Sequence, residues 1–241
     1  MKKLFLMGIA SAALMAAQPA NAVLQVAFSD GTHIFTCADG QSCDEDGAAK
    51  SVLLINTVVG NFRIEGTFTQ SFLDGTDQIS FSNLTIANTG ATTGHLSMVT
   101  SDTSFAGPVA FIRESGSLTF NDGIGSPLST IAFFADKANG QGAGGGLLTP
   151  GTELFHVSGT PTHDPDSFSG SALDPFFSTA PFSMTEAATL GMVGGSSVTG
   201  FNQAMEAGVP EPSTWAMLVA GFGLLGLFGL KKARTERLSA I

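Results

Sequence analysis

The side chains best suited to hold a metal ion gather at two places in the sequence. His156, His163, Asp164 and Asp166 form the densest group, and the run Asp44-Glu45-Asp46 is the second. Imidazole and carboxylate groups are common metal ligands, and acidic loops can bind calcium. The first group has no established ligand spacing such as His-Glu-x-x-His, and the second does not fit the EF-hand register. We therefore expect solvated loops at both places, with no metal site and no cofactor.

The residue types that could perform covalent or acid–base catalysis are present without a recognisable pattern. No Gly-x-Ser-x-Gly segment occurs, and Ser115-Gly116-Ser117 is typical of an ordinary turn. The chain has 4 histidines and 20 acids, so a catalytic triad or a pair of glycosidase carboxylates could form in space. Nothing in the sequence selects the residues that would form it. We therefore expect a protein that is not an enzyme.

The two cysteines, Cys37 and Cys43, flank the turn sequence Asp39-Gly40. Their spacing excludes a redox Cys-x-x-Cys motif, and a zinc site would lack two further ligands at finger spacing. Export would place them in an oxidising compartment, so we expect a disulfide rather than two free thiols. By the chain-entropy model, closing so small a loop contributes about 2 kcal/mol to stability.

The composition predicts that β-strands position the candidate side chains named above. Ser, Thr, Asn and Gly are abundant and favour short strands and turns over helices, and apolar and polar residues alternate along many segments. Turn sequences such as Asp74-Gly75 recur about every ten residues, which predicts an all-β, antiparallel sandwich with a jelly-roll-like body. The expected strands are residues 24–28, 32–36, 51–59, 61–72, 78–87, 95–99, 109–113, 117–120, 128–135, 154–158, 182–190 and 196–204.

Three segments depart from this regular pattern. The alternation slips at Ser82-Asn83, which predicts a bulge. Residues 139–146 contain five glycines and no lysine, which indicates a flexible loop and not a phosphate-binding loop. Residues 161–181 contain four prolines and indicate a long irregular loop. The last two strands are expected to form a closing pair, although residues 185–190 could equally form a helical turn.

The N-terminal residues have the pattern of a secretory signal peptide. Met1-Lys2-Lys3 precedes an apolar run over residues 4–17, and Ala20-Asn21-Ala22 matches an Ala-x-Ala cleavage site. We therefore expect export by the general secretion machinery and cleavage after Ala22.

The exported body, residues 23–209, is strongly acidic. Two of the 20 acids of the chain, Glu211 and Glu236, lie beyond it, and it has only four cations. Those cations are Lys50, Arg63, Arg113 and Lys137, which gives a net charge near −14. Such a body repels phosphate backbones and anionic lipids, so we expect no nucleic-acid partner.

The C-terminal residues have the pattern of a membrane-spanning segment followed by a cluster of basic residues. Residues 215–230 contain no charged residue and would span about 24 Å as a helix, somewhat short for a bilayer. Lys231, Lys232 and Arg234 follow, so the positive-inside rule places the C-terminus in the cytoplasm. The expected membrane residues are Trp215, Leu218, Phe222, Leu225, Phe228 and Leu230.

A stiff, extended peptide precedes this segment. Pro210 and Pro212 flank Glu211, and each proline favours extended geometry in the residue before it. A Pro-Glu-Pro triplet, a short Gly-rich apolar run and a basic cluster, in this order, resemble the PEP-CTERM sorting signal of Gram-negative bacteria. The resemblance covers about the last 33 residues. It implies that a membrane-embedded exosortase recognises the triplet and removes the tail, and that export accompanies extracellular polysaccharide production.

The sequence therefore predicts five parts: a signal peptide (1–22), an exported β-rich domain (23–206), a linker with the Pro-Glu-Pro motif (207–214), a transmembrane helix (215–230) and a basic cytoplasmic tail (231–241). The expected function is that of a non-enzymatic surface, extracellular-matrix or biofilm protein, anchored in the inner membrane as a precursor and then released to the cell surface or beyond. Two alternatives stay open. One is a secreted protein that binds or acts on polysaccharide, and the other is a permanently membrane-tethered periplasmic domain.

Overall fold

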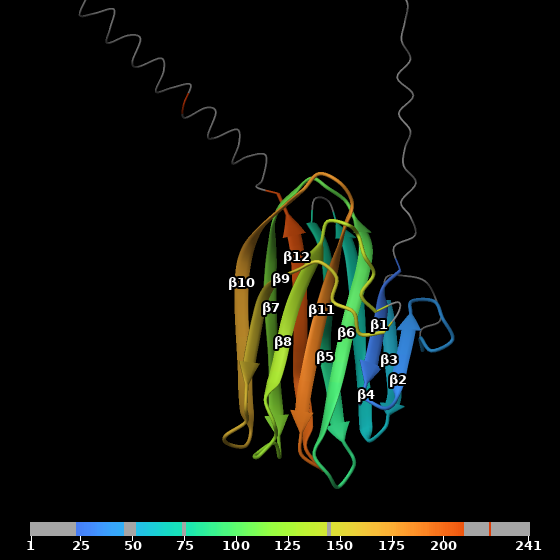
Figure 1. Ribbon diagram of the computed structural model, residues 1–241, viewed down its shortest axis with the longest axis vertical. Helices are drawn as coiled ribbons and strands as arrows, with labels where there is room; N and C mark the ends of the chain where they lie inside the picture. The colour runs from blue at the N-terminus through green and yellow to red at the C-terminus, as the bar shows by residue number, and fades with distance from the viewer. Residues whose placement is uncertain (1–22, 46–51, 74–75, 144–145, 210–221, 223–241) are drawn as a thin grey trace, which may run out of the picture.

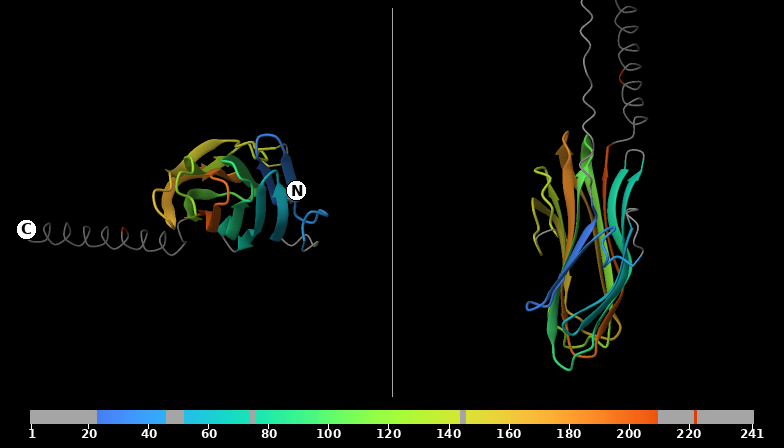
Figure 2. Two further views of the ribbon diagram at one scale, coloured as in Figure 1. Left: turned by 90° about the horizontal axis from the view of Figure 1, so that it is seen from below. Right: turned by 90° about the vertical axis from the view of Figure 1, so that its right-hand side faces the viewer.

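The chain folds into two facing antiparallel sheets, each of six strands among the described residues (Figure 1, Figure 2). The computed structural model describes residues 23–45, 52–73, 76–143, 146–209 and 222. The front sheet of Figure 1 has the order β2-β1-β6-β11-β8-β9, and the rear sheet has the order β10-β7-β12-β5-β4-β3. The strands are β1 (Gln25–Ser29), β2 (Ile34–Ala38), β3 (Val52–Val59), β4 (Phe62–Leu73), β5 (Thr76–Asn88), β6 (Gly94–Phe105), β7 (Val109–Asn121), β8 (Ser129–Asp136), β9 (Thr152–Gly159), β10 (Asp166–Ser178), β11 (Phe182–Met192) and β12 (Ser197–Gly208).

The last eight strands follow the jelly-roll order. Strands β5 to β8 alternate between the sheets, β9 pairs with β8, and β10 to β12 alternate again. The rear sheet thus contains β5-β12-β7-β10 as neighbours, and the front sheet contains β6-β11-β8-β9. Two Greek keys arranged in this way form a double-sheet sandwich. The prediction of an all-β, antiparallel sandwich is confirmed.

Phenylalanine side chains fill much of the space between the sheets. The rings of Phe28, Phe68, Phe81 and Phe201 contact one another in series, with centroids 4.9 to 6.1 Å apart. All four side chains are at most 1% exposed. Each buried side chain of this size contributes about 2 to 3 kcal/mol relative to an exposed one. The apolar residues of the alternating sequence pattern are therefore the residues that hold the sheets together.

Strand β7 is one continuous strand in a region where the sequence predicted two. Residues 109–113 and 117–120 were expected to be separated by a turn at Ser115-Gly116-Ser117, but the strand is continuous from Val109 to Asn121. Gly116 faces the core, where a Cβ atom would lie 3.2 Å from Cζ of Phe133. The prediction of a turn is wrong because a glycine in a strand can also mark a close approach of two sheets.

Strand β10 lies where the sequence predicted a long irregular loop. Residues 166–178 pair with β7, and β10 forms an edge of the rear sheet. An edge strand needs backbone partners on one side only, so it can contain a proline such as Pro175. The pairing with β7 shifts register between Pro175 and Ser178. The loop prediction for residues 161–181 is therefore wrong over most of its length.

The last two strands do not pair with each other. Strand β11 lies in the front sheet and β12 in the rear sheet, so they are opposite each other across the core. Residues 185–190 belong to β11 and not to a helical turn. The bulge predicted at Ser82-Asn83 is confirmed, because the register of β5 shifts there against both neighbours and Asn83 has a φ of 55°.

The glycine-rich segment after β8 packs against the outer face of the front sheet. The backbone N–H groups of Gly142 and Ala143 donate to the hydroxyl of Ser101, at 3.1 and 2.8 Å. Ala143 is 1% exposed and packs on Ala27 and Val99. The described residues of this segment form a loop, as predicted, and this loop covers part of the sheet.

The chain enters and leaves the sandwich at the same end, the upper end in Figure 1. Gln25 begins β1 opposite Ser101 near the end of β6, and Gly208 ends β12. Strand β12 thus reaches two residues into the predicted linker. No helix among the described residues is long and apolar enough to cross a membrane.

Candidate functional site: the sorting motif and a serine-lined groove

The outer face of the rear sheet carries a hollow of about 530 Å³. Two rows of small, mostly polar side chains line it. Each row crosses the neighbouring strands β10, β7, β12 and β5. One row contains Ser171, Ser115, Ala204 and Ser80, which are cross-strand partners in that order. The other row contains Ser169, Ser117, Asn202 and Ser82. We call this hollow the serine groove.

Two glycines on the inner side of the sheet explain why the outer side is hollow here. A Cβ atom on Gly170 would lie 2.9 Å from Cζ of Phe155, and one on Gly116 would lie 3.2 Å from Cζ of Phe133. Because the glycines have no side chain, the backbone of β7 and β10 can approach the front sheet.

The groove offers hydrogen-bonding groups without ionisable ones. The hydroxyls of Thr69 and Ser80 lie 2.8 Å apart, and the Asn202 side-chain oxygen accepts from the N–H of Asn83 at 2.8 Å. The lining residues are serine, asparagine, glutamine, glycine, alanine and one phenylalanine, and none of them titrates. General acid–base catalysis needs a titrating side chain within hydrogen-bonding reach. This groove can therefore bind polar, uncharged groups, and its own lining supplies no acid or base.

Three acids point into the core between the sheets instead of into solvent. Asp102 on β6, Glu114 on β7 and Glu186 on β11 are all 0% exposed. Burial raises the pKa of Asp102 to about 7, although the N–H of Thr103 donates to it at 2.6 Å. Burial, and then the neighbouring charge of Asp174, raise the pKa of Glu114 to about 8.

Glu186 is the most deeply buried of these acids. Burial raises its pKa well above the ordinary value, and neither carboxyl oxygen has a hydrogen-bond partner among the described residues. Its strand neighbours are Thr100 and Phe133. An alternating pattern alone did not reveal these inward acids, because the sequence gives no sign of which polar residues face the core.

The histidine and acid group of the sequence is spread over separate places. His156 lies on β9 and pairs with Glu153, with 2.6 Å between Nδ1 and Oε1. His163 pairs with Asp166 at 3.2 Å, and Asp164 accepts from the N–H of Asp122 at 2.8 Å. Among the described residues no three His, Cys, Asp or Glu side chains are grouped so that they could hold a metal ion.

Asp44 is a buried structural residue and not the exposed turn residue that the sequence suggested. It is 4% exposed, and its two carboxylate oxygens accept from the N–H groups of Leu54 and Gly40, at 3.0 and 3.2 Å. The N–H of Glu45 donates to the carbonyl of Leu54 at 3.0 Å. The loop is thereby fastened to the free edge of β3, while Asp46 lies outside the described residues.

Cys37 and Cys43 form the disulfide that the sequence predicted. Their Cα atoms are 5.9 Å apart, within the usual range for this bond. Because Cys37 belongs to β2 and Cys43 to the loop fastened by Asp44, the disulfide joins the edge of the front sheet to the segment that covers the edge of the rear sheet.

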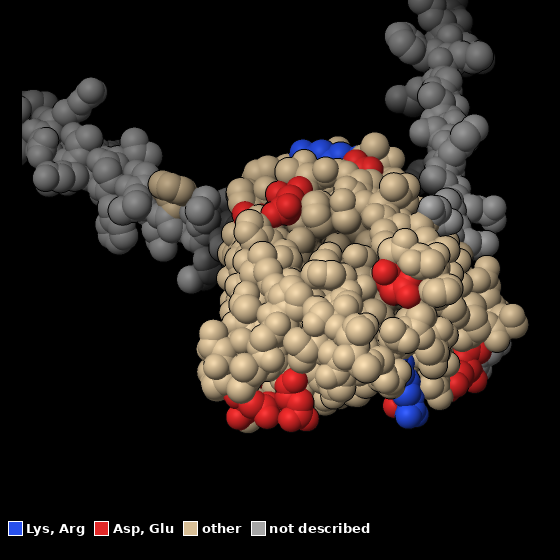
Figure 3. All heavy atoms as spheres, turned by 60° about the horizontal axis from the view of Figure 1, so that its bottom comes forward, with Lys and Arg blue, Asp and Glu red and all other residues tan. Residues whose placement is uncertain are grey.

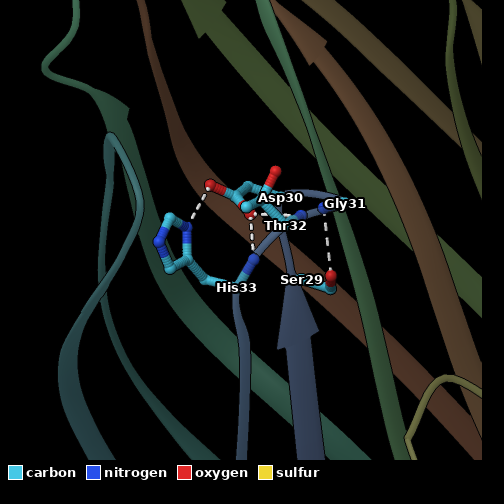
Figure 4. A network of polar contacts seen from close by, with 5 residues as sticks. All are labelled: Ser29, Asp30, Gly31, Thr32 and His33. Carbon is cyan, nitrogen blue, oxygen red and sulfur yellow. Dashed lines mark hydrogen bonds and ion pairs between the residues drawn. The ribbon is translucent and has the colours of Figure 1, made fainter.

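The hairpin between β1 and β2 contains a polar network that sequence reasoning missed (Figure 4). The Asp30 carboxylate accepts from the N–H groups of His33 and Thr32, at 2.6 and 2.8 Å, and lies 3.0 Å from Nδ1 of His33. The His33 N–H, then the His33 ring and the Thr32 N–H, lower the pKa of Asp30 to about 2. A Cβ atom on Gly60 would lie 1.8 Å from Asp30, so the β3–β4 turn packs against this network. The turn sequence Asp30-Gly31 was the available signal.

The predicted sorting residues lie almost entirely outside the described residues. This holds for Ala20 and Ala22, for the triplet Pro210, Glu211 and Pro212, and for the basic Lys231, Lys232 and Arg234. Of the predicted membrane residues only Phe222 is described, and it is helical and 65% exposed. These site assignments therefore stay predictions.

Charged side chains are sparse on the face shown in Figure 3. Acids stand mostly toward its margins, a few basic side chains accompany them, and a broad uncharged area lies between. This distribution fits a chain in which only 12% of residues are charged.

Comparison with known families gives one match. Residues 208–234 match the family model described as the PEP-CTERM protein-sorting motif. The chain carries a PEP-CTERM sorting motif. This motif begins at the last residue of β12 and supports an exported protein with a membrane-anchored precursor. The comparison with curated proteins finds no match.

Several solved structures resemble the chain loosely. TmCBM61 in complex with beta-1,4-galactotriose is 11% identical over 60% of this chain and 88% of that chain, with a TM-score of 0.30. A structure described as CBM4 structure and function is 12% identical over 65% and 94% of the two chains, with a TM-score of 0.25. Bacteriophage CBA120 tailspike protein 4 is 10% identical, with a TM-score of 0.29, and the chain spans only 20% of its length. At these TM-scores the likeness carries no argument about this chain.

Proposed function

We propose that the chain is an exported, non-enzymatic protein of the cell surface or extracellular matrix, sorted by its PEP-CTERM motif and processed by an exosortase. The match of residues 208–234 to the sorting motif is the observation that carries this proposal. The general secretion machinery exports the chain, and the signal peptide is removed after Ala22. Residues 215–230 then hold the precursor in the inner membrane until the exosortase cuts near Pro210–Pro212.

The fold is compatible with removal of both terminal segments. All described strands lie between Gln25 and Gly208, so a cut after residue 209 leaves every one of them in place. Both ends of the sandwich domain lie at one end of the fold (Figure 1). The opposite end of the sandwich is thus directed away from the points of processing, where it can contact other components of the outer layer.

The non-enzymatic part of the proposal rests on the chemistry of the serine groove. Its lining contains no side chain that titrates, so the groove supplies neither a general base nor an activated nucleophile. The buried acids Asp102, Glu114 and Glu186 face the core and are 0% exposed, so a substrate in solvent does not reach them.

The test is the intact mass of the extracellular protein from a strain with an exosortase and from one without it. The proposal expects an N-terminus at Val23 and, only where the exosortase is present, a C-terminus near Pro210–Pro212. A Glu211→Gln, Pro212→Ala variant should accumulate uncut. A mass that includes Leu230 in both strains would contradict the proposal and favour a permanently tethered periplasmic domain, which fractionates with the inner membrane.

A second candidate function is binding of extracellular polysaccharide, and the serine groove favours it. Rows of hydroxyl and amide groups without charge suit the hydroxyls of a neutral sugar chain. Ser115→Leu fills the groove from the outer face without entering the core, and Asn56→Leu is a matched change on the exposed face of β3. Only Ser115→Leu should abolish retention on polysaccharide in affinity electrophoresis. Equal retention of wild type and both variants would reject the groove as the site.

A further inference from the structure

An apolar patch marks the outer face of the rear sheet at the end where the chain leaves the sandwich. It consists of Phe111 on β7, of Leu173 and Pro175 on β10, and of Phe177, which follows them at a register shift of β10, and we call it the apical patch. Leu173 is 60% exposed and Phe177 is 66% exposed. Exposed aromatic and aliphatic side chains that cluster on one face commonly mark an interaction surface.

Strand register places this patch beside the last residue of β12. Pro175 pairs with Phe111, and Phe111 pairs with Gly208. Neighbouring strands are about 4.8 Å apart, so the patch begins within about 10 Å of the chain exit. A Cβ atom on Gly208 would lie 2.8 Å from Cζ of Phe111, which shows that the Phe111 ring lies across the end of β12.

The chain beyond this point is short before its apolar run begins. Residues 209–214 join the sandwich to Trp215, and fully extended they reach at most about 20 Å. When residues 215–230 are inserted in a membrane, the apical end of the sandwich is therefore held within about two nanometres of the bilayer surface. This step rests on the proposed function, which places those residues in the membrane.

Two of the few cations of the body lie at the same end. Among the described residues of the body the cations are Arg63, Arg113 and Lys137, and two of them border the patch. Arg113 is the cross-strand partner of Leu173, and Nζ of Lys137 lies 5.4 Å from the centroid of the Phe176 ring beneath the patch.

This end also carries acids, and hydrogen bonds to backbone N–H groups do not remove their charge. Glu206 lies 3.5 Å from Arg113, Asp77 accepts from the N–H of Ala106 at 2.9 Å, and Asp136 accepts from the N–H groups of Ala138 and Gly140, at 2.9 and 3.0 Å. Glu153 on β9 pairs with His156, and Asp174 lies between Leu173 and Pro175 on β10. The exposed apolar side chains and the short tether, and not the net charge, therefore favour contact with the bilayer.

We propose that the apical patch is a membrane-contact surface, on which the sandwich rests against the phospholipid bilayer while its own C-terminal segment is inserted. Phe177 and Leu173 enter the headgroup layer, and Lys137 contacts lipid phosphate. Because the tether is short and the patch lies beside the chain exit, the contact also orients the sandwich with its apical end toward the bilayer. The chain exit, and the Pro-Glu-Pro triplet after it, are thereby kept at the membrane surface where a membrane-embedded protease acts.

The test uses the full chain in vesicles of phosphatidylcholine and phosphatidylglycerol. A nitrobenzoxadiazole dye is attached at Pro175→Cys, within the patch, or at Ile124→Cys, a matched exposed site at the opposite end that is 61% exposed in the native protein. The native cysteines are paired, so the introduced thiol takes the label. Quenching by lipids that carry a nitroxide near the headgroup should be several-fold stronger at site 175 than at site 124. Adding Leu173→Ser and Phe177→Ser should return the quenching at site 175 to the level of site 124.

The outcomes separate failure of this inference from failure of the proposed function. If the chain does not float with the vesicles, anchoring by residues 215–230 fails and the inference falls with it. If it floats but both sites are quenched equally, anchoring stands and the membrane contact is refuted. If site 175 is shielded from iodide in detergent without vesicles, a second copy or the chain's own tail covers the patch, and the inference is likewise overturned.

Discussion

The buried carboxyl group of Glu186 should make the protein less stable at neutral pH than in mild acid, and Glu186→Gln should remove this effect. Glu186 is 0% exposed, and neither carboxyl oxygen has a hydrogen-bond partner among the described residues. Burial raises its pKa well above the ordinary value. The folded state therefore keeps a proton that the unfolded state releases above about pH 4.3. Between the unfolded and the folded pKa, stability falls by about 1.4 kcal/mol for each pH unit.

Even one pH unit of this slope is a sizeable part of the 5 to 15 kcal/mol that is typical of a folded domain. Glutamine has nearly the same shape and releases no proton in either state. The free energy of unfolding of Glu186→Gln, minus that of the wild type, should therefore grow by about 1.4 kcal/mol for each pH unit above about pH 5, for as long as the pH stays below the raised pKa of Glu186. The contributions of Asp102 and Glu114 are common to both proteins and cancel in the difference.

Urea unfolding at several pH values, followed by far-ultraviolet circular dichroism, measures this difference. Fluorescence is unsuitable because Trp215 is the only tryptophan, it lies beyond the sandwich, and the chain has no tyrosine. Glu65→Gln is the matched control, since Glu65 pairs with Arg63 on the outer face and its side chain is 42% exposed. That variant should keep the pH slope of the wild type. A Glu186→Gln difference that stays constant with pH would refute the reasoning, because it would show that the carboxyl group is ionised inside the folded sandwich.

Three further predictions concern the edges and turns of the fold. Replacing Cys37 and Cys43 by serine should lower the free energy of unfolding by about 2 kcal/mol in urea titrations, and an unchanged midpoint would contradict this. Asp30→Asn should lower the melting temperature at neutral pH but not near pH 2, because the lowered pKa of Asp30 makes its contribution present above about pH 4 and lost as pH falls through about 2. Gly151→Ala should abolish folding, because the new Cβ atom would overlap the Ala135 carbonyl oxygen. Gly31 has a similar positive φ but no atom within 4 Å of a Cβ, so Gly31→Ala should lower the free energy of unfolding by only about 1 kcal/mol.

Sequence pattern predicted the strands whose two faces differ in environment. Strands such as β4 and β12 have mostly apolar residues on the core face and mostly polar residues on the other, so hydrophobicity with a period of two identifies them. The same reasoning failed for β10, whose serines, glycine and proline carry little of that signal. This strand exists because β7 offers it a partner along twelve residues of chain, which is a contact between distant segments.

The serine groove could not be predicted from local sequence. Ser115-Gly116-Ser117 and Ser169-Gly170-Ser171 both resemble turns, because small residues are common where the chain bends. In the fold they are paired segments of two neighbouring strands, with the glycines against the aromatic rings of the front sheet and the serines outward. Two turn-like sequences become one groove only when β7 and β10 are brought together in register.

The sequence by itself determined the sorting motif, the disulfide and the all-β character of the body. Each of these depends on the order of residues over a short stretch: a triplet before an apolar run, two cysteines around a turn, and alternation along a strand. Only the tertiary structure decided that Asp102, Glu114 and Glu186 face the core, that the serines form a groove, and that Phe111 and Pro175 are paired beside the chain exit. The physical reason is that burial and cross-strand neighbours depend on which distant strands pair, and pairing is settled by the packing of the two sheets as a whole.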